Sequence, residues 1–233
     1  MSLLKRVQES DIAGTVIASK KVQKEAQKIE DADALAEFLK PGVAIGVVIE
    51  GVIPFDARVR AVGLAINGEI GVLESNSPLW PQALKFLACG EYVIHDAKPF
   101  LHALANEGIE PAPVLFDTAI ASYLIAPGSR AHDLEVLAFT ELGISMNVLE
   151  NGQAALLDAR PVGQIAAERA RITQKLHERF AKVLEDRQQI KLLVEMELPL
   201  EPVLTTIERR GVKLDSDFIA LLDMKSIIKW RLI

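Results

Sequence analysis

The dipeptide Asn67-Gly68 constrains the fold of this chain more than any other feature. It lies between two runs rich in apolar residues, 59–66 and 69–73. Asn-Gly is preferred at the centre of a type I′ turn, because both central residues there need a positive φ. The two runs are therefore predicted to pair as an antiparallel β-hairpin. Residues 43–49 form a continuous apolar run before Glu50, which predicts a central strand covered on both faces.

After the hairpin the pattern alternates between helix and strand. Helices are predicted at 78–88, 98–106, 117–126 and 132–142, and short strands at 92–95 and 114–116. Residues 162–210 are predicted to be almost unbroken helix, in two pieces that join near 197–199. Strands in sequence followed by βα units indicate an α/β fold with a mixed sheet flanked by helices, followed by long C-terminal helices.

Composition sets limits on compartment and partners. The chain has 233 residues, half of them hydrophobic, which is enough for one core and the beginning of a second domain. A net charge of −6 argues against a basic nucleic-acid surface over the whole chain. Cys89 has no cysteine partner and is expected to be a small buried side chain at a helix end. No segment resembles a membrane span or a signal peptide, so a cytoplasmic location is expected.

Three stretches carry a resemblance to a known family. They are VIHDAKPFLHALANEGIE (93–110), PVLFDTAIASYLIAP (113–127) and LLVEMELPLEPVLTTIERRGVKLD (192–215). The third is the most specific, because Glu-Met-Glu-x-Pro-Leu followed by Ile-Glu-x-x-Gly-Val-x-Leu-Asp is hard to obtain by chance. Together they resemble the family A DNA polymerases, the family of bacterial DNA polymerase I, over residues 29–222.

The resemblance implies an RNase H-like 3′–5′ exonuclease fold and a division of the chain. Residues 1–28 would be an N-terminal helical linker, 29–190 an exonuclease-like domain and 191–233 a truncated start of the polymerase domain. The family's polymerase catalytic motifs do not occur in this sequence, so the chain alone is not expected to polymerise DNA. The chain would contact DNA as part of a parent polymerase, whose polymerase domain would lie in the same polypeptide. No membrane partner is expected.

In active members of the family, carboxylates hold two divalent metal ions that activate water and stabilise the leaving oxygen. The family's first motif places its aspartate at Val48 and its glutamate at Glu50. The second places a helper residue at Asp96 and its aspartate at Phe100. The third places its tyrosine at Ile165 and its aspartate at Arg169.

Three of the four metal-binding carboxylates are therefore missing. The resemblance implies an inactive exonuclease-like domain that supports DNA replication and repair synthesis, with Glu50 vestigial and no metal expected. If Asp56 were the motif carboxylate instead of Glu50, this argument would weaken. An active exonuclease that uses magnesium, and a module that binds DNA ends or a partner protein, stay open as alternatives.

Basic residues outside the motifs are weaker candidates for contact with DNA. Arg209 and Arg210 precede Gly211 where the family's polymerase domain begins, and they could approach duplex DNA. A further basic series lies along the predicted helix that begins at 162, interleaved with glutamates, and is expected to be a solvated face. Its members are Arg169, Arg171, Lys175, Arg179 and Lys182.

Overall fold

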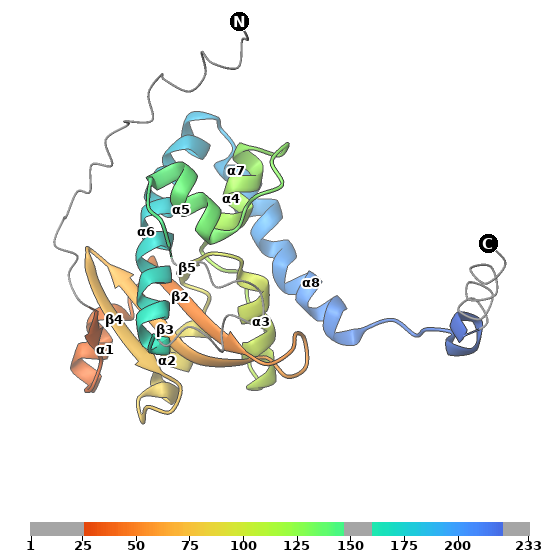
Figure 1. Ribbon diagram of the computed structural model, residues 1–233, viewed down its shortest axis with the longest axis horizontal. Helices are drawn as coiled ribbons and strands as arrows, with labels where there is room; N and C mark the ends of the chain where they lie inside the picture. Colours follow the sequence, from red (N-terminus) through yellow and green to blue (C-terminus); the bar gives the residue numbers. More distant parts are fainter. Residues whose placement is uncertain (1–25, 147–159, 221–233) are drawn as a thin grey trace, which may run out of the picture.

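The computed structural model describes residues 26–146 and 160–220 (Figure 1). Its centre is a six-stranded mixed sheet with the strand order β1-β4-β3-β2-β5-β6. β3 pairs antiparallel with both β2 and β4. The other three pairs, β2–β5, β5–β6 and β1–β4, are parallel. The strands are β1 (Gln27–Lys28), β2 (Val43–Glu50), β3 (Arg58–Ile66), β4 (Glu69–Glu74), β5 (Tyr92–Ile94) and β6 (Phe116–Asp117).

The predicted hairpin is confirmed. β3 and β4 pair from Ile66 opposite Glu69, and the two residues between them have positive φ, 51° at Asn67 and 79° at Gly68. β2 lies between β3 and β5, so its prediction as an internal strand is also confirmed. The strand ends at Glu50, after a β-bulge between Val48 and Ile49.

Helices cover the sheet and extend beyond it (Figure 1). The α/β architecture with long C-terminal helices is therefore confirmed. The helices are α1 (Ala32–Phe38), α2 (Trp80–Leu87), α3 (Ala97–Asn106), α4 (Thr118–Ile125), α5 (Leu134–Leu142), α6 (Val162–Asp186), α7 (Ile190–Leu192), the π-helix η3 (Leu193–Glu197) and α8 (Leu198–Arg210).

α6 packs directly on the backbone of the central strands, because two glycines leave room for it. A Cβ atom on Gly46 of β2 would lie 2.2 Å from the Ala170 nitrogen. One on Gly63 of β3 would lie 2.2 Å from the Ala166 oxygen. Gly46 and Gly63 are opposite each other in the β2–β3 register, so they form a single flat position under the helix. This contact fixes which residues of α6 face the sheet.

The join in the C-terminal helices lies elsewhere than predicted. The break falls at residues 187–189, where Gln188 has a φ of 57°, and not at 197–199. Proline at 199 does not break the helix, because it directly follows a π-helical turn in which the regular α-helical hydrogen-bond pattern is already interrupted. The stretch 193–197 stays helical with the wider π geometry.

Three smaller predictions were wrong. Cys89 is exposed, because it follows the end of α2 on its solvent side. The sixth strand is Phe116–Asp117 instead of 114–116. Lys28 lies in a strand and not in a helix, while the rest of the predicted linker up to residue 25 lies outside the described residues. None of the helices in the two described ranges combines the length and apolar character that a membrane crossing requires.

Candidate functional site

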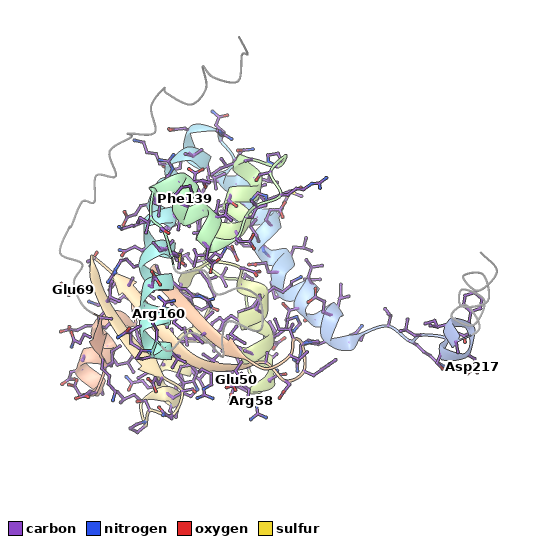
Figure 2. The ribbon with its side chains drawn as sticks, in the orientation of Figure 1. Glu50, Arg58, Glu69, Phe139, Arg160 and Asp217 are labelled. Atoms are coloured by element: carbon purple, nitrogen blue, oxygen red, sulfur yellow. The ribbon has the colours of Figure 1, made fainter. Side chains whose placement is uncertain are left out.

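The first motif lies on β2, and its two positions have different surroundings. Val48 is half-buried, whereas the side chain of Glu50 is 65% exposed. The Glu50 carboxylate accepts a hydrogen bond from Arg60 Nη1 at 2.5 Å. Figure 2 shows Glu50 beside Arg58 at the end of the β2–β3 pair, where the two residues are register partners. Glu50 therefore has two arginines as its nearest charged neighbours on β3.

Asp56, the alternative motif carboxylate, lies in the same region as Glu50. Both line an open cavity of about 750 Å³ whose other charged residues include Arg58 and Arg60. Asp56 pairs with Arg58 at 3.8 Å, and both side chains are largely exposed. Moving the motif from Glu50 to Asp56 therefore leaves the carboxylate among the same arginines.

The second motif places one polar and one apolar residue at the start of α3. Asp96 follows β5 with a φ of 55°, and the residue is exposed to solvent at the cavity. Partial desolvation of its carboxyl group and the charge of Asp117 together raise its pKa to about 6. Phe100 is fully buried and packs edge-to-face on Tyr92, with ring centroids 5.8 Å apart. The position of the family's aspartate is thus part of the hydrophobic core.

The third motif lies on α6. Ile165 is buried. Arg169, one turn later, donates a hydrogen bond from Nη1 to the carbonyl oxygen of Val47 at 2.7 Å. Burial lowers the pKa of Arg169, and the nearby Glu135 and Glu168 act in the opposite direction. Arg169 is therefore an anchor between α6 and β2, and its prediction as part of a solvated face is wrong.

A second cavity, of about 610 Å³, brings Asp96 and Arg169 together. Val47, His95 and Glu135 also line it, but Glu50 does not. The β2 residue beneath Arg169 is Gly46, since a Cβ atom there would lie 2.6 Å from the Arg169 Cβ. The structure thus places Asp96 of the second motif and Arg169 of the third in one cavity and Glu50 of the first in the other.

His95, at the end of β5, is held inside this cavity. Its Nδ1 lies 2.9 Å from the Thr118 hydroxyl, which itself donates to the carbonyl oxygen of Ile94. Burial lowers the pKa of His95, against the opposing charge of Asp117. Within residues 26–146 and 160–220, no three His, Cys, Asp or Glu side chains are placed to hold a metal ion together.

A buried pair of carboxyl groups lies behind the cavity and was not anticipated. Asp117 is fully buried and accepts hydrogen bonds from four backbone N–H groups, those of Asp96, Ala97, Ala119 and Ile120. Its side chain also caps α4, the helix predicted at 117–126. Glu201 of α8 is its neighbour, and burial raises the pKa of Glu201 to about 10, with the charge of Asp117 and a hydrogen bond to it adding to the effect.

Glu201 carries a sequence signal that could have identified it. Leu198, Glu201 and Thr205 follow each other at helical spacing, and all three are buried on the inner face of α8. A glutamate in such a series is either paired or protonated when the helix packs. The Glu201 Oε2 atom has no hydrogen-bond partner, which fits a neutral carboxyl group that donates to Asp117.

Arg209 and Arg210, the two predicted DNA contacts, differ in environment. Arg209 Nη1 donates to Asn106 Oδ1 at 2.7 Å and to the carbonyl oxygen of Pro54 at 3.2 Å. It therefore ties α8 to α3 and to the β2–β3 loop. Arg210 is exposed at the C-terminal end of α8.

Comparison with known proteins identifies relatives of this chain. DNA polymerase I of Mycobacterium tuberculosis is 29% identical over 194 residues, which are 78% of this chain and 22% of that protein. DNA polymerase I of Pseudomonas aeruginosa is 30% identical over 161 residues, 64% of this chain and 17% of that protein. The resemblance to DNA polymerase I is confirmed. No protein-family model matches the chain.

Solved structures agree on the fold. The Pol1 polymerase domain of M. smegmatis, in complex with DNA primer-template and dNTP, superposes with a TM-score of 0.69 at 24% identity, over 86% of this chain and 35% of that one. Brucella melitensis NrnC superposes with a TM-score of 0.63 at 20% identity, over 82% of this chain and 98% of that one. The chain spans only about a fifth of the DNA polymerase I relatives named above.

Proposed function

We propose that this chain is a 3′–5′ exonuclease-like domain that has lost nuclease activity and acts as a structural support for DNA synthesis by a parent polymerase. The observation that carries the proposal is the placement of Arg169. Its guanidinium group lines the cavity that also holds Asp96, at a position where the resemblance places a metal-binding aspartate. The other aspartate positions are Val48 and the fully buried Phe100.

Electrostatics oppose metal binding in this cavity. A divalent ion about 4 Å from a guanidinium group would be repelled by roughly 8 kcal/mol at an effective dielectric constant near 20. Asp96 and Glu135 line the same cavity and offset only part of this repulsion. Glu50, paired with Arg60, lines the other cavity. A catalytic pair of metal ions therefore lacks its ligands.

The support role follows from how α8 is attached. Glu208 contacts Lys98 Nζ at 2.8 Å and His102 Nε2 at 2.7 Å. Arg209 bonds Asn106, which itself donates to the carbonyl oxygens of Pro54 and Ala57. The buried Glu201 adds a third contact, to Asp117. These contacts hold α8 against the exonuclease-like part of the chain, residues 29–190. We propose that α8 belongs to the start of the polymerase domain, residues 191–233.

DNA is proposed to reach the chain through a polymerase domain in cis, in keeping with the primer-template in the M. smegmatis structure. Arg210 is the better of the two proposed phosphate contacts because its side chain is exposed, whereas Arg209 is occupied within the fold. A role in DNA repair and a cytoplasmic location remain part of this proposal.

Thermal unfolding with and without metal tests the loss of the metal site. A metal that binds the folded state raises its stability by RT ln(1 + [L]/Kd). We expect no change in Tm on adding millimolar magnesium or manganese, for the chain or for an Asp96→Asn variant. A saturable rise in Tm that is lost in Asp96→Asn or in Glu50→Gln would overturn the proposal in favour of a working nuclease.

A further inference from the structure

Two buried polar groups at the contact between α8 and the sheet are unpaired. Tyr92 of β5 is fully buried, and Glu201 of α8 is 6% exposed. In the part of the chain that the structure describes, neither the Tyr92 hydroxyl oxygen nor the Glu201 Oε2 atom has a hydrogen-bond partner. Buried polar groups in folded proteins are almost always paired, either with protein or with an ordered water molecule. The two atoms therefore point to a third group that pairs with them.

The two side chains lie close to one another. Tyr92 is two residues before Ile94, which pairs with Asp117 in the β5–β6 register. Glu201 is hydrogen-bonded to Asp117, so it reaches the same part of the sheet. Burial raises the pKa of Tyr92, and the charge of Glu201 raises it further, which requires the two groups to be near each other. The Tyr92 ring is held in place by edge-to-face packing on Phe100 of α3.

The two unpaired atoms are complementary in their hydrogen bonding. With a pKa of about 10, Glu201 is protonated at neutral pH. Its bond to Asp117 uses Oε1, because Oε2 has no partner. Oε2 is then a carbonyl oxygen that accepts hydrogen bonds, whereas the Tyr92 hydroxyl can donate one. A donor and an acceptor that are close but not bonded to each other are the arrangement that one water molecule bridges.

We propose that one ordered water molecule is bound between β5 and α8, where it accepts from the Tyr92 hydroxyl and donates to Glu201 Oε2. The bridge would spare both groups the desolvation penalty of a buried polar atom without a partner. It would also explain how α8 keeps a protonated glutamate on its buried face, because both carboxyl oxygens would be hydrogen-bonded. The proposal does not depend on the proposed function.

A crystal structure of the full chain, at a resolution that shows ordered water, tests the bridge directly. We expect a density peak at hydrogen-bonding distance, about 2.5–3.0 Å, from both Tyr92 Oη and Glu201 Oε2. A direct hydrogen bond between these two oxygens would overturn the proposal. The absence of a peak between them would also overturn it.

A substitution tests the same bridge in solution. Removing a buried hydroxyl group that has no partner should raise Tm, whereas removing one that is hydrogen-bonded to water should lower it. We therefore expect Tyr92→Phe to lower Tm by about 2–4 °C. The matched control is Tyr123→Phe. Tyr123 is 50% exposed, so its hydroxyl can be hydrated in the folded and unfolded chains alike, and its loss should leave Tm nearly unchanged.

The sign of the Tm shift decides the outcome. A rise in Tm for Tyr92→Phe would mean that the hydroxyl group is unpaired and would overturn the proposal. A fall no larger than that of Tyr123→Phe would overturn it as well, because the buried hydroxyl would then make no hydrogen bond of consequence. Near-UV circular dichroism checks that both variants keep the packing of the parent chain.

Discussion

At the scale of single residues, Arg169 links α6 to β2 at the position where the family resemblance places a metal-binding aspartate. Its guanidinium satisfies a backbone carbonyl of β2 while lying among carboxylates that moderate its charge. Arg169→Ala leaves the Val47 oxygen without this donor, so we expect a loss of about 1–3 kcal/mol in the free energy of unfolding. Urea denaturation measures this loss.

Arg179 supplies the control, because its ion pair with Glu141 is on the surface. Arg179→Ala should cost at most about 1 kcal/mol. Arg169→Asp, which restores the family's residue type, should cost more than Arg169→Ala, since it places a carboxylate near Glu135 without a cation. Equal stability of the Arg169→Ala and Arg179→Ala variants would contradict the anchoring role.

Glu201 makes a prediction about pH. Its pKa of about 10 in the folded chain exceeds the unfolded value of 4.5, so the folded chain keeps a proton that the unfolded chain releases. The stability this provides is complete below pH 4.5 and is lost as the pH rises towards 10. The slope for one proton is about 1.4 kcal/mol per pH unit.

Glu201→Gln keeps a neutral donor beside Asp117 and should remove this slope. The variant should be more stable than the parent chain at pH 8, by a margin that is larger than at pH 6. Urea denaturation at these pH values measures the margin. Glu208→Gln is the control, because hydrogen bonds from Lys98 and His102 lower the pKa of Glu208, and its contribution is lost as the pH falls. Parallel pH profiles for Glu201→Gln and the parent would refute a protonated Glu201.

At the scale of elements, the contact between α6 and the sheet rests on the absence of two side chains. Gly63→Ala would place a methyl group 2.2 Å from a backbone oxygen of α6, and backbone cannot move as a flexible side chain can. We expect a loss of about 3 kcal/mol or more in the free energy of unfolding. Gly128→Ala is the matched control, with nothing within 4 Å. Similar denaturation midpoints for the two variants would show that α6 can move away at little cost.

The break between α6 and α7 gives a stabilising prediction. Gln188 is exposed and has a φ of 57°, a conformation that costs a residue with a Cβ atom about 1–2 kcal/mol. Gln188→Gly should therefore raise the free energy of unfolding by up to about 1 kcal/mol, as measured by thermal or urea denaturation. Gln164→Gly, in the exposed first turn of α6, should lower it. A loss of stability in Gln188→Gly would mean that its side chain has a role that the backbone conformation does not reveal.

Signals in the sequence were sufficient to predict an element where that element is set by residues close together in the chain. The β3–β4 hairpin is such an element, because its turn is set by the adjacent residues Asn67 and Gly68. The break at 187–189 has no proline or glycine to mark it, so the conspicuous proline at 199 led to the wrong position.

At the scale of the whole molecule, the candidate site could be predicted by residue type but not by arrangement. The motif alignment predicted that metal-binding carboxylates are missing, and Phe100 is buried accordingly. It did not reveal that Glu50 and Arg169 line different cavities, or that Glu201 lies beside Asp117. These facts depend on how α6 and α8 pack on the sheet, across 84 to 119 positions of sequence.

The measurement that tests the central claim most directly is digestion of a 3′-labelled single-stranded oligonucleotide by the full chain, with magnesium and then with manganese. Asp96→Asn and Glu50→Ala, run in parallel, identify any contaminating nuclease, because a contaminant would act equally in all three preparations. The account predicts no shortening of the oligonucleotide beyond that seen with both variants. Metal-dependent loss of 3′ nucleotides that disappears in either variant would show that the site is a working nuclease.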